Sequence, residues 1–216
     1  MYPTNQIIKV FYSQAEYLNR EWTTFEQLFM FSEARSKLLY DNRISEFTDT
    51  IKFSLIYDIE MTISRLTDQT KKNGNPNLTV ESFVEQVCNN VDKTINEKDQ
   101  EKRKNRITRL WKRLPKLVHE IRKFRNKSIA HLDLKVACGD KAPSLSRLRT
   151  IKKAVEVIRI IAEEGLALAT GKMRSIKNQR IERATRWVHG CLQFGSERPS
   201  EMLRVMDKKA VTNAVN

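Results

Sequence analysis

This sequence contains little glycine, proline or cysteine. Its 216 residues include six Gly and five Pro, and so few turn-forming residues favour helices over many short strands. The three cysteines, Cys88, Cys138 and Cys191, stand about fifty residues apart. Their odd number argues against a disulfide framework, and no pair has the spacing of a metal site. We therefore expect neither feature and no metal or other cofactor.

Long apolar runs are missing too. No stretch approaches the roughly 18 uncharged apolar residues of a membrane span. Met1–Gln14 lacks the basic region and apolar run of a signal peptide. We therefore expect a soluble, cytoplasmic protein with no membrane partner. Hydrophobic residues make up 40% of the chain, which is enough for the core of one domain with or without an appendage.

Positive charge is concentrated in the second half of the chain. Residues 1–97 carry 10 basic and 14 acidic side chains, net −4, whereas residues 98–216 carry 30 basic and 12 acidic ones, net +18. A half this basic indicates a polyanionic partner, most simply nucleic acid. A solvated cationic surface without such a partner is the alternative.

Apolar residues recur at steps of three and four along most of the chain, which predicts an all-α fold. The five predicted helices cover about residues 7–31, 44–68, 79–95, 98–127 and 144–170. In the second helix, Phe47, Phe53 and Tyr57 belong to a wide apolar stripe, so we expect this helix to be buried. The segment 71–77 is predicted to be a loop, and Gly171 suits the end of the fifth helix.

The C-terminal region has a weaker pattern. It predicts a further basic helix over residues 172–194 and a loosely attached tail after it. We therefore divide the chain into a helical domain, 1–170, and a basic C-terminal helix and tail, 171–216.

The fourth helix contains a heptad seam. Its a and d positions are Ile107, Leu110, Leu114, Leu117, Ile121 and Phe124. Trp111, Val118 and Arg125 follow the edge of the seam, so we expect Arg125 to be half-buried. The seam can serve as core or as a dimer surface, and Trp111 fits either better than a base-stacking role. Pro115 should kink the helix near Trp111.

The other faces of this helix hold basic side chains that suit an RNA backbone. The candidates for RNA binding are Arg109, Lys112, Lys116, Arg122, Lys123 and Lys127. His119 lies opposite the seam and is interpreted as a surface residue. Arg65 and Asp68 are three positions apart and are expected to pair across the end of the second helix.

The segment Arg125-Asn126-Lys127-Ser128-Ile129-Ala130-His131 offers the chain's best set of groups for chemistry. Cleavage of RNA without a metal uses the 2′-OH as nucleophile. It needs proton transfer, which a histidine performs near neutral pH. It also needs stabilisation of the charge on phosphorus, which a guanidinium fork provides. Asn126 can donate and accept, so it suits orienting His131 or a phosphate oxygen.

The spacing within this segment carries a geometric prediction. On one unbroken α-helix, six residues place Arg125 and His131 about 120° apart and about 9 Å along the axis. Such side chains do not converge easily on one phosphate. We therefore expect a helix break between them, a site assembled from two chains, or both.

The Arg-Asn-Lys-Ser-Ile-Ala-His segment resembles the Arg-(x4–6)-His signature of the HEPN superfamily. A second block has the order found in its abortive-infection U-type branch, and the likeness covers about residues 10–165. That block comprises Leu28-Phe29, Ala34-Arg35, Leu38-Leu39, Ile63-Ser-Arg-Leu-Thr-Asp68 and Asn77-Leu-Thr-Val. The resemblance implies a dimerising helical bundle whose two motifs share a cleft, and Arg125, Asn126 and His131 as catalytic residues.

What the resemblance implies for function is a metal-independent endoribonuclease of a phage-defence or toxin–antitoxin system. Such an enzyme leaves a 2′,3′-cyclic phosphate. One alternative is a non-catalytic module that binds RNA, DNA or a nucleotide and needs the charge but not His131. Another is an interaction subunit whose seam and basic face dock an acidic antitoxin or a nucleotidyltransferase. Both remain open on the sequence alone.

Overall fold

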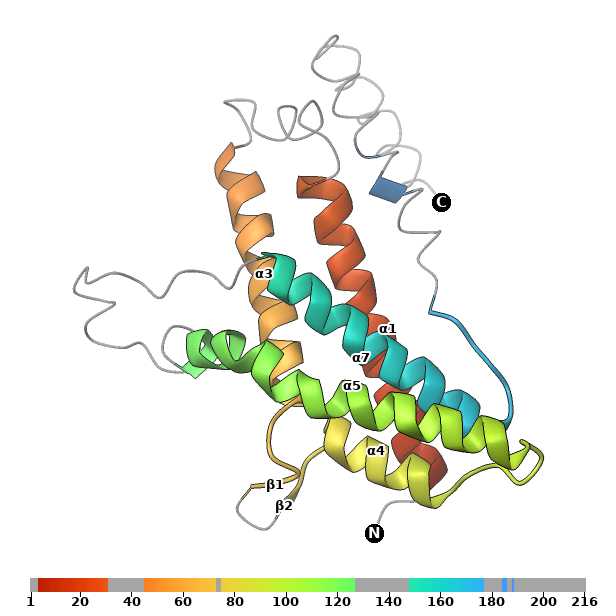
Figure 1. Cartoon of the computed structure of the whole chain (residues 1–216). Coiled ribbons are helices and arrows are strands. Elements are labelled where there is room, and N and C mark those ends of the chain that lie inside the picture. The colour runs from red at the N-terminus through yellow and green to blue at the C-terminus, as the bar shows by residue number, and fades with distance from the viewer. Residues whose placement is uncertain are drawn as a thin grey trace, which may run out of the picture. The chain divides into compact units, whose positions relative to one another are not determined.

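The computed structural model of the chain describes residues 4–30, 45–72, 75–126 and 148–176, together with 184, 185 and 188. These residues form helices and one short hairpin (Figure 1). The helices are α1 (Thr4–Phe29), α3 (Ser45–Leu66), α4 (Val80–Asn89), α5 (Glu97–Phe124) and α7 (Leu148–Thr170). The predicted all-α fold of about five helices is confirmed.

The predicted loop over residues 71–77 contains a minimal hairpin. Its strands, β1 (Lys71–Lys72) and β2 (Asn75–Pro76), pair antiparallel with Lys71 opposite Pro76. Because each strand has two residues, the hairpin does not alter the fold class.

The chain divides into two compact units. One comprises Met1–Trp22 and Leu55–Lys177, and the other comprises Thr23–Ser54 and Asn178–Asn216. The residues of the candidate site that the structure describes belong to the first unit. The predicted domain boundary after residue 170 stays a prediction.

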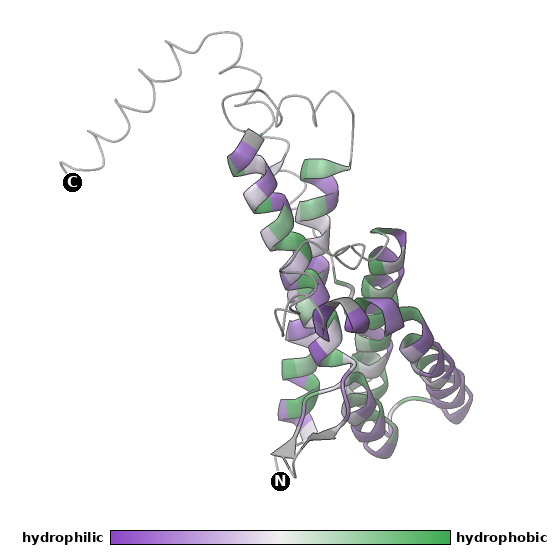
Figure 2. Cartoon of the chain, turned by 90° about the vertical axis from the view of Figure 1, so that its left-hand side faces the viewer, coloured by the Kyte–Doolittle hydropathy of each residue, from purple (hydrophilic) through white to green (hydrophobic). Residues whose placement is uncertain are grey.

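Within the first unit, α5 packs along α7 and α4 contacts both helices. α1 joins this group through Phe11, whose ring stacks on Phe83 of α4 with centroids 4.1 Å apart. Close approach is possible here because Gly165 of α7 presents no side chain to the Phe83 ring. Apolar residues (green) and polar residues (purple) alternate along these helices (Figure 2).

The apolar seam of α5 packs within the core of the same chain. Ile107, Leu114, Val118 and Ile121 are at most 2% exposed, whereas Leu110 and Leu117 are half-buried. The buried stripe therefore includes Val118, which was predicted at the edge of the seam. These residues form intramolecular core, so of the two alternatives for the seam, core and dimer surface, the first holds for them. The helix continues through Pro115.

α3 is less buried than predicted. Ile56, Ile59, Ile63 and Leu66 form its buried stripe, but Phe47, Phe53 and Tyr57 are 66%, 42% and 40% exposed. At 100° per residue, all three lie at least about 120° around the helix from Ile59. They therefore fall outside the buried stripe despite their apolar character.

Helix ends in the first unit follow local sequence. The side chains and backbone N–H groups of Thr79 and Ser82 form a reciprocal capping box that starts α4. α4 ends at Asn89, earlier than predicted: Asn90 leaves the helical conformation, with φ −126° and ψ 61°, and its side-chain amide donates to the Gln86 carbonyl. Gly171 ends α7 as predicted, with a φ of 67°.

Beyond α7, residues 172–176 have no regular secondary structure, so the predicted helix over 172–194 does not begin at 172. Glu163 accepts a hydrogen bond from the Ile176 backbone N–H at 2.8 Å, and Ile176 is buried. Most of the remaining predicted helix lies outside the described residues. No helix in the described part is both long and apolar enough to cross a bilayer.

Candidate active site

The candidate site lies where the end of α5 meets the chain just after α3. Arg122 lies in the last turn of α5, and Arg125 follows the helix end at Phe124. Residues 125 and 126 form a wider π-type turn, a feature that often occurs at functional sites. The regular α-helix thus ends before the motif, and the geometry between Arg125 and His131 stays a prediction.

Asp68 joins both arginines. Its Oδ2 accepts a hydrogen bond from Arg125 Nη1 at 2.6 Å, and its Oδ1 accepts one from Arg122 Nη2 at 3.2 Å. The side chains of Arg125 and Asp68 are 17% and 29% exposed, so Arg125 is half-buried as predicted. Because the contact is charge-assisted and partly shielded from water, it fixes the direction of the guanidinium.

Asn126 holds the other edge of the same guanidinium. Its Oδ1 accepts from Arg125 Nε at 2.9 Å and from Nη2 at 2.8 Å. A guanidinium has five N–H donors, so these two bonds and the one to Asp68 leave two donors for a phosphate. Asn126 therefore orients Arg125, a role that the sequence did not suggest. The amide NH₂ of Asn126 has no partner among the described residues.

The expected pair of Arg65 and Asp68 does not form. Arg65 Nη2 instead donates to Thr62 Oγ1 at 2.9 Å. Asp68 lies beyond the end of α3, where the chain no longer follows the helix, so its carboxylate faces α5 rather than the preceding turn. The sequence contained a signal for the contact of Asp68 with α5, because Arg122 and Arg125 lie near the end of that basic helix. The three-residue spacing between Arg65 and Asp68 instead favoured Arg65 as the partner.

The predicted RNA-binding residues divide into two groups. Arg109, Lys112, Lys116 and Lys123 are exposed along α5, with no acidic partner among the described residues. Arg122 differs because it is half-buried and paired with Asp68. It therefore helps to hold the carboxylate that Arg125 also bonds. Lys127 and His131 lie outside the described residues. His119 is exposed, as predicted.

Other cations of the basic half are used by the fold. Arg103 and Arg106 both pair with Glu164 of α7, whose side chain is 5% exposed. Arg159 pairs with Glu163 four residues further on. The net charge of +18 therefore overstates the positive charge that is available to bind a partner. The exposed cations of α5 are the ones that can contact a polyanion.

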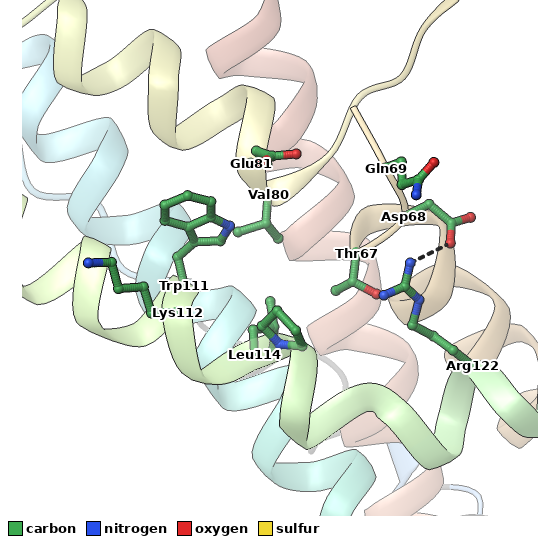
Figure 3. Close-up of a pocket in the computed structure, with 10 residues that line it drawn as sticks. Thr67, Asp68, Gln69, Val80, Glu81, Trp111, Lys112, Leu114 and Arg122 are labelled. Carbon is green, nitrogen blue, oxygen red and sulfur yellow. Dashed lines mark hydrogen bonds and ion pairs between the residues drawn. The ribbon is translucent and has the colours of Figure 1, made fainter. Parts of the chain in front are cut away.

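A cavity of about 240 Å³ is lined in part by Asp68 and Arg122 (Figure 3). It is bounded by the residues after α3, the start of α4 and one side of α5. Asp68 and Arg122 lie on its rim, and Trp111 and Leu114 form part of its wall. The sequence did not predict this cavity, because its walls come from three separated segments. No group of three His, Cys, Asp or Glu side chains suited to a metal occurs in the part of the chain that the structure describes.

The helical architecture and the Arg-Asn motif at the end of α5 define a protein of the HEPN class. The sequence model of the HEPN family described as AbiU2 matches residues 5–184. The chain therefore belongs to the AbiU2 family of HEPN domains, an abortive-infection family, and the predicted resemblance is confirmed. Neither a curated protein nor a solved structure matches the chain.

Proposed function

We propose that this protein is a metal-independent endoribonuclease of a phage-defence or toxin system. The observation that carries the proposal is the set of hydrogen bonds made by the Arg125 guanidinium. Asp68 and Asn126 orient its guanidinium, and two of its N–H donors are left for a phosphate. Family membership and the exposed cations along α5 support the same reading.

The reaction breaks one P–O bond and forms another. The 2′-oxygen of the RNA attacks the neighbouring phosphorus and loses its proton, and the 5′-oxygen leaves with a proton, so the products are a 2′,3′-cyclic phosphate and a 5′-hydroxyl. His131 performs a proton transfer, worth roughly 10²–10⁴-fold in rate. Arg125 stabilises the charge that develops on the phosphoryl oxygens, worth on the order of 10²–10³-fold.

A homodimer would supply two histidines for the two proton transfers of the reaction. One histidine takes the proton from the 2′-OH, and the same residue of the partner subunit supplies the proton for the 5′-oxygen. Since most soluble oligomers are two-fold symmetric, two copies of the motif can face each other across one cleft. The intramolecular use of the α5 seam means that such a dimer forms through other residues.

Cleavage of RNA in the presence of EDTA tests the proposal. Wild-type protein should cut single-stranded RNA and leave 3′ ends that are cyclic phosphates, and His131→Ala should abolish the cutting. His119→Ala is the matched control, because this histidine is exposed on α5 and does not line the cavity. A wild-type protein that binds RNA without cutting it, or a His131→Ala variant that cuts equally well, would indicate the non-catalytic alternative.

A further inference from the structure

The cavity beside Asp68 has the size of a site for one flat ring system. Its volume of about 240 Å³ lies below the roughly 300–1,000 Å³ of sites that hold drug-sized ligands. It therefore suits a fragment of a larger ligand. A nucleobase is such a fragment when the rest of the RNA strand stays outside.

Its walls combine apolar surface with unused polar groups. The indole of Trp111 in α5 points toward Val80 of α4 (Figure 3), and Leu114 and Pro115 also line the cavity. The Trp111 indole N–H and the Gln69 side-chain amide have no partner among the described residues. Aromatic surface with a few convergent polar groups is the composition of a small-molecule site.

The polar side of the cavity offers one uncommitted side-chain amide, that of Gln69. The carboxylates of Asp68 and Glu81 also line the cavity, but they already accept hydrogen bonds from Arg122, Arg125 and Thr70. Pro115 has no N–H, so the Trp111 carbonyl lacks its usual helical donor. An exocyclic amino group can donate to the Trp111 carbonyl or to the Gln69 amide oxygen, whereas uracil has no exocyclic amino group and only its N3–H to donate. The Gln amide pairs with adenine in a bidentate manner.

The position of the cavity links it to the motif. Asp68 borders the cavity and accepts hydrogen bonds from Arg122 and Arg125 through separate oxygens. A phosphate bound by the free donors of Arg125 would therefore have the cavity beside it. One nucleotide can place its phosphate at Arg125 and direct its base toward Trp111.

We propose that this cavity binds one amino-bearing nucleobase, adenine above all, of the RNA strand whose phosphate is held by Arg125. This inference rests on the proposed ribonuclease function for its substrate, but it concerns binding. The base stacks on Trp111 and bonds Gln69. The cavity then selects which phosphate is cut.

Binding to uncleavable RNA tests the inference without requiring cleavage. The probes are two labelled 2′-O-methyl hexanucleotides, one all uridine and the other with a single adenosine, titrated with the full chain in EDTA and followed by fluorescence anisotropy. Wild type should prefer the adenosine-containing strand. Trp111→Leu should weaken its binding by roughly 5- to 150-fold, the range of one lost base stack, and Trp111→Phe should retain most of the affinity.

Gln69→Leu separates base recognition from stacking. It should remove the preference for adenosine without weakening the all-uridine strand, and it keeps the inference testable if circular dichroism shows that Trp111→Leu loses helicity. His119→Leu, on the exposed face of α5, should change nothing. Equal wild-type affinity for the two strands, or a Gln69→Leu variant that keeps the preference, overturns the inference.

The two proposals fail separately. Trp111- and Gln69-dependent binding by a protein that never cuts unmodified RNA supports the base site and rejects the ribonuclease. Cutting that depends on His131, by a protein whose binding ignores Trp111 and Gln69, does the reverse.

Discussion

Asp68 and Arg125 are 57 positions apart in the sequence, and the carboxylate of one accepts a hydrogen bond of 2.6 Å from the guanidinium of the other. The contact connects Arg125, the first residue of the Arg-(x4–6)-His motif, to the segment that follows α3. Arg122 shares the same carboxylate, so two cations stand against one anion and the group keeps a net positive charge. Such a group orients an arginine and still attracts a phosphate.

Replacing Asp68 should slow cleavage without weakening RNA binding. Asp68→Ala frees the guanidinium of Arg125 to rotate, and a misplacement of about 1 Å can reduce a rate by about 10²-fold. We expect kcat to fall by that order while KM does not rise, because a negative charge near the phosphate is removed as well. Steady-state cleavage kinetics measure both. Glu120→Ala removes an exposed carboxylate of α5 and should leave both constants unchanged.

Arg125→Lys should show that the shape of the cation matters as well as its charge. A lysine ammonium cannot bond Asp68 and Asn126 and still present a fork to phosphate. The cleavage rate should fall by about 10²–10³-fold, while the salt dependence of RNA binding stays as in wild type. Arg113→Lys, an exposed change on α5, is the matched control. A variant with near wild-type activity would contradict the role assigned to the guanidinium.

The exposed cations of α5 should set the salt dependence of RNA binding. Each lysine that contacts a phosphate of single-stranded RNA contributes about 0.7 to the slope of log K against log salt. Lys112→Ala and Lys116→Ala should each reduce the slope by about that amount. Binding titrations at several salt concentrations measure it. Lys9→Ala, which removes an exposed lysine of α1, should leave the slope unchanged, and an equal loss there would indicate nonspecific charge.

Gly165→Ala should destabilise the fold although alanine is the better helix former. A Cβ at Gly165 would lie 2.5 Å from two carbons of the Phe83 ring. Phe83 is fully buried and stacked on Phe11, so the ring has little room to move. Overpacking of this kind costs about 1–3 kcal/mol, more than the roughly 1 kcal/mol of gained helix propensity. Urea unfolding measures the difference.

The partner ring provides the control for Gly165→Ala. In a Phe83→Leu background the clashing ring carbons are absent, so adding Gly165→Ala should cost less than it does in wild type, as a double-mutant cycle would show. An unchanged cost in the two backgrounds would mean that Phe83 is not its cause.

Tyr17 should ionise late in an alkaline titration. Its hydroxyl donates to Asp58 Oδ2 at 2.7 Å, and this hydrogen bond, together with burial, raises the pKa of Tyr17 to about 12. Because the folded-state pKa lies above the usual 10, the bond stabilises the fold fully below pH 10, and this contribution is lost as the pH rises through 12. Ultraviolet titration should show the late transition, and Tyr17→Phe should remove it. Asp58→Asn should return the pKa of Tyr17 toward 10.

Much of the fold could be predicted because the buried stripes are periodic. Ile151, Val155 and Ile158 of α7 are buried as their spacing indicates, and the Thr79 cap and the Gly171 terminus fall where local chemistry places them. Burial on α3 was harder to predict. Phe53 and Tyr57 are apolar enough to suggest burial, but only the packing of other helices decides which side of α3 is covered.

The site was predictable only where it is local in sequence. Arg125 and Asn126 stand in a motif, so they could be singled out directly, although the hydrogen bonds between them were not predicted. Asp68 and Gln69 reach the site through tertiary contacts, and nothing in their own segment distinguishes a carboxylate that pairs locally with Arg65 from one that faces α5. Trp111 was interpreted as core because its edge position on the heptad resembles a packing position, whereas it borders a cavity.

The hydrogen bonds between Arg125 and Asn126 join adjacent residues, so the two side chains form one hydrogen-bonded body. The bond to Asp68 has a different character, because it connects that body to a separate part of the fold. The carboxylate of Asp68 is thus a natural reporter, because an isotope-detected change at this one group would record whether its bond to Arg125 is present.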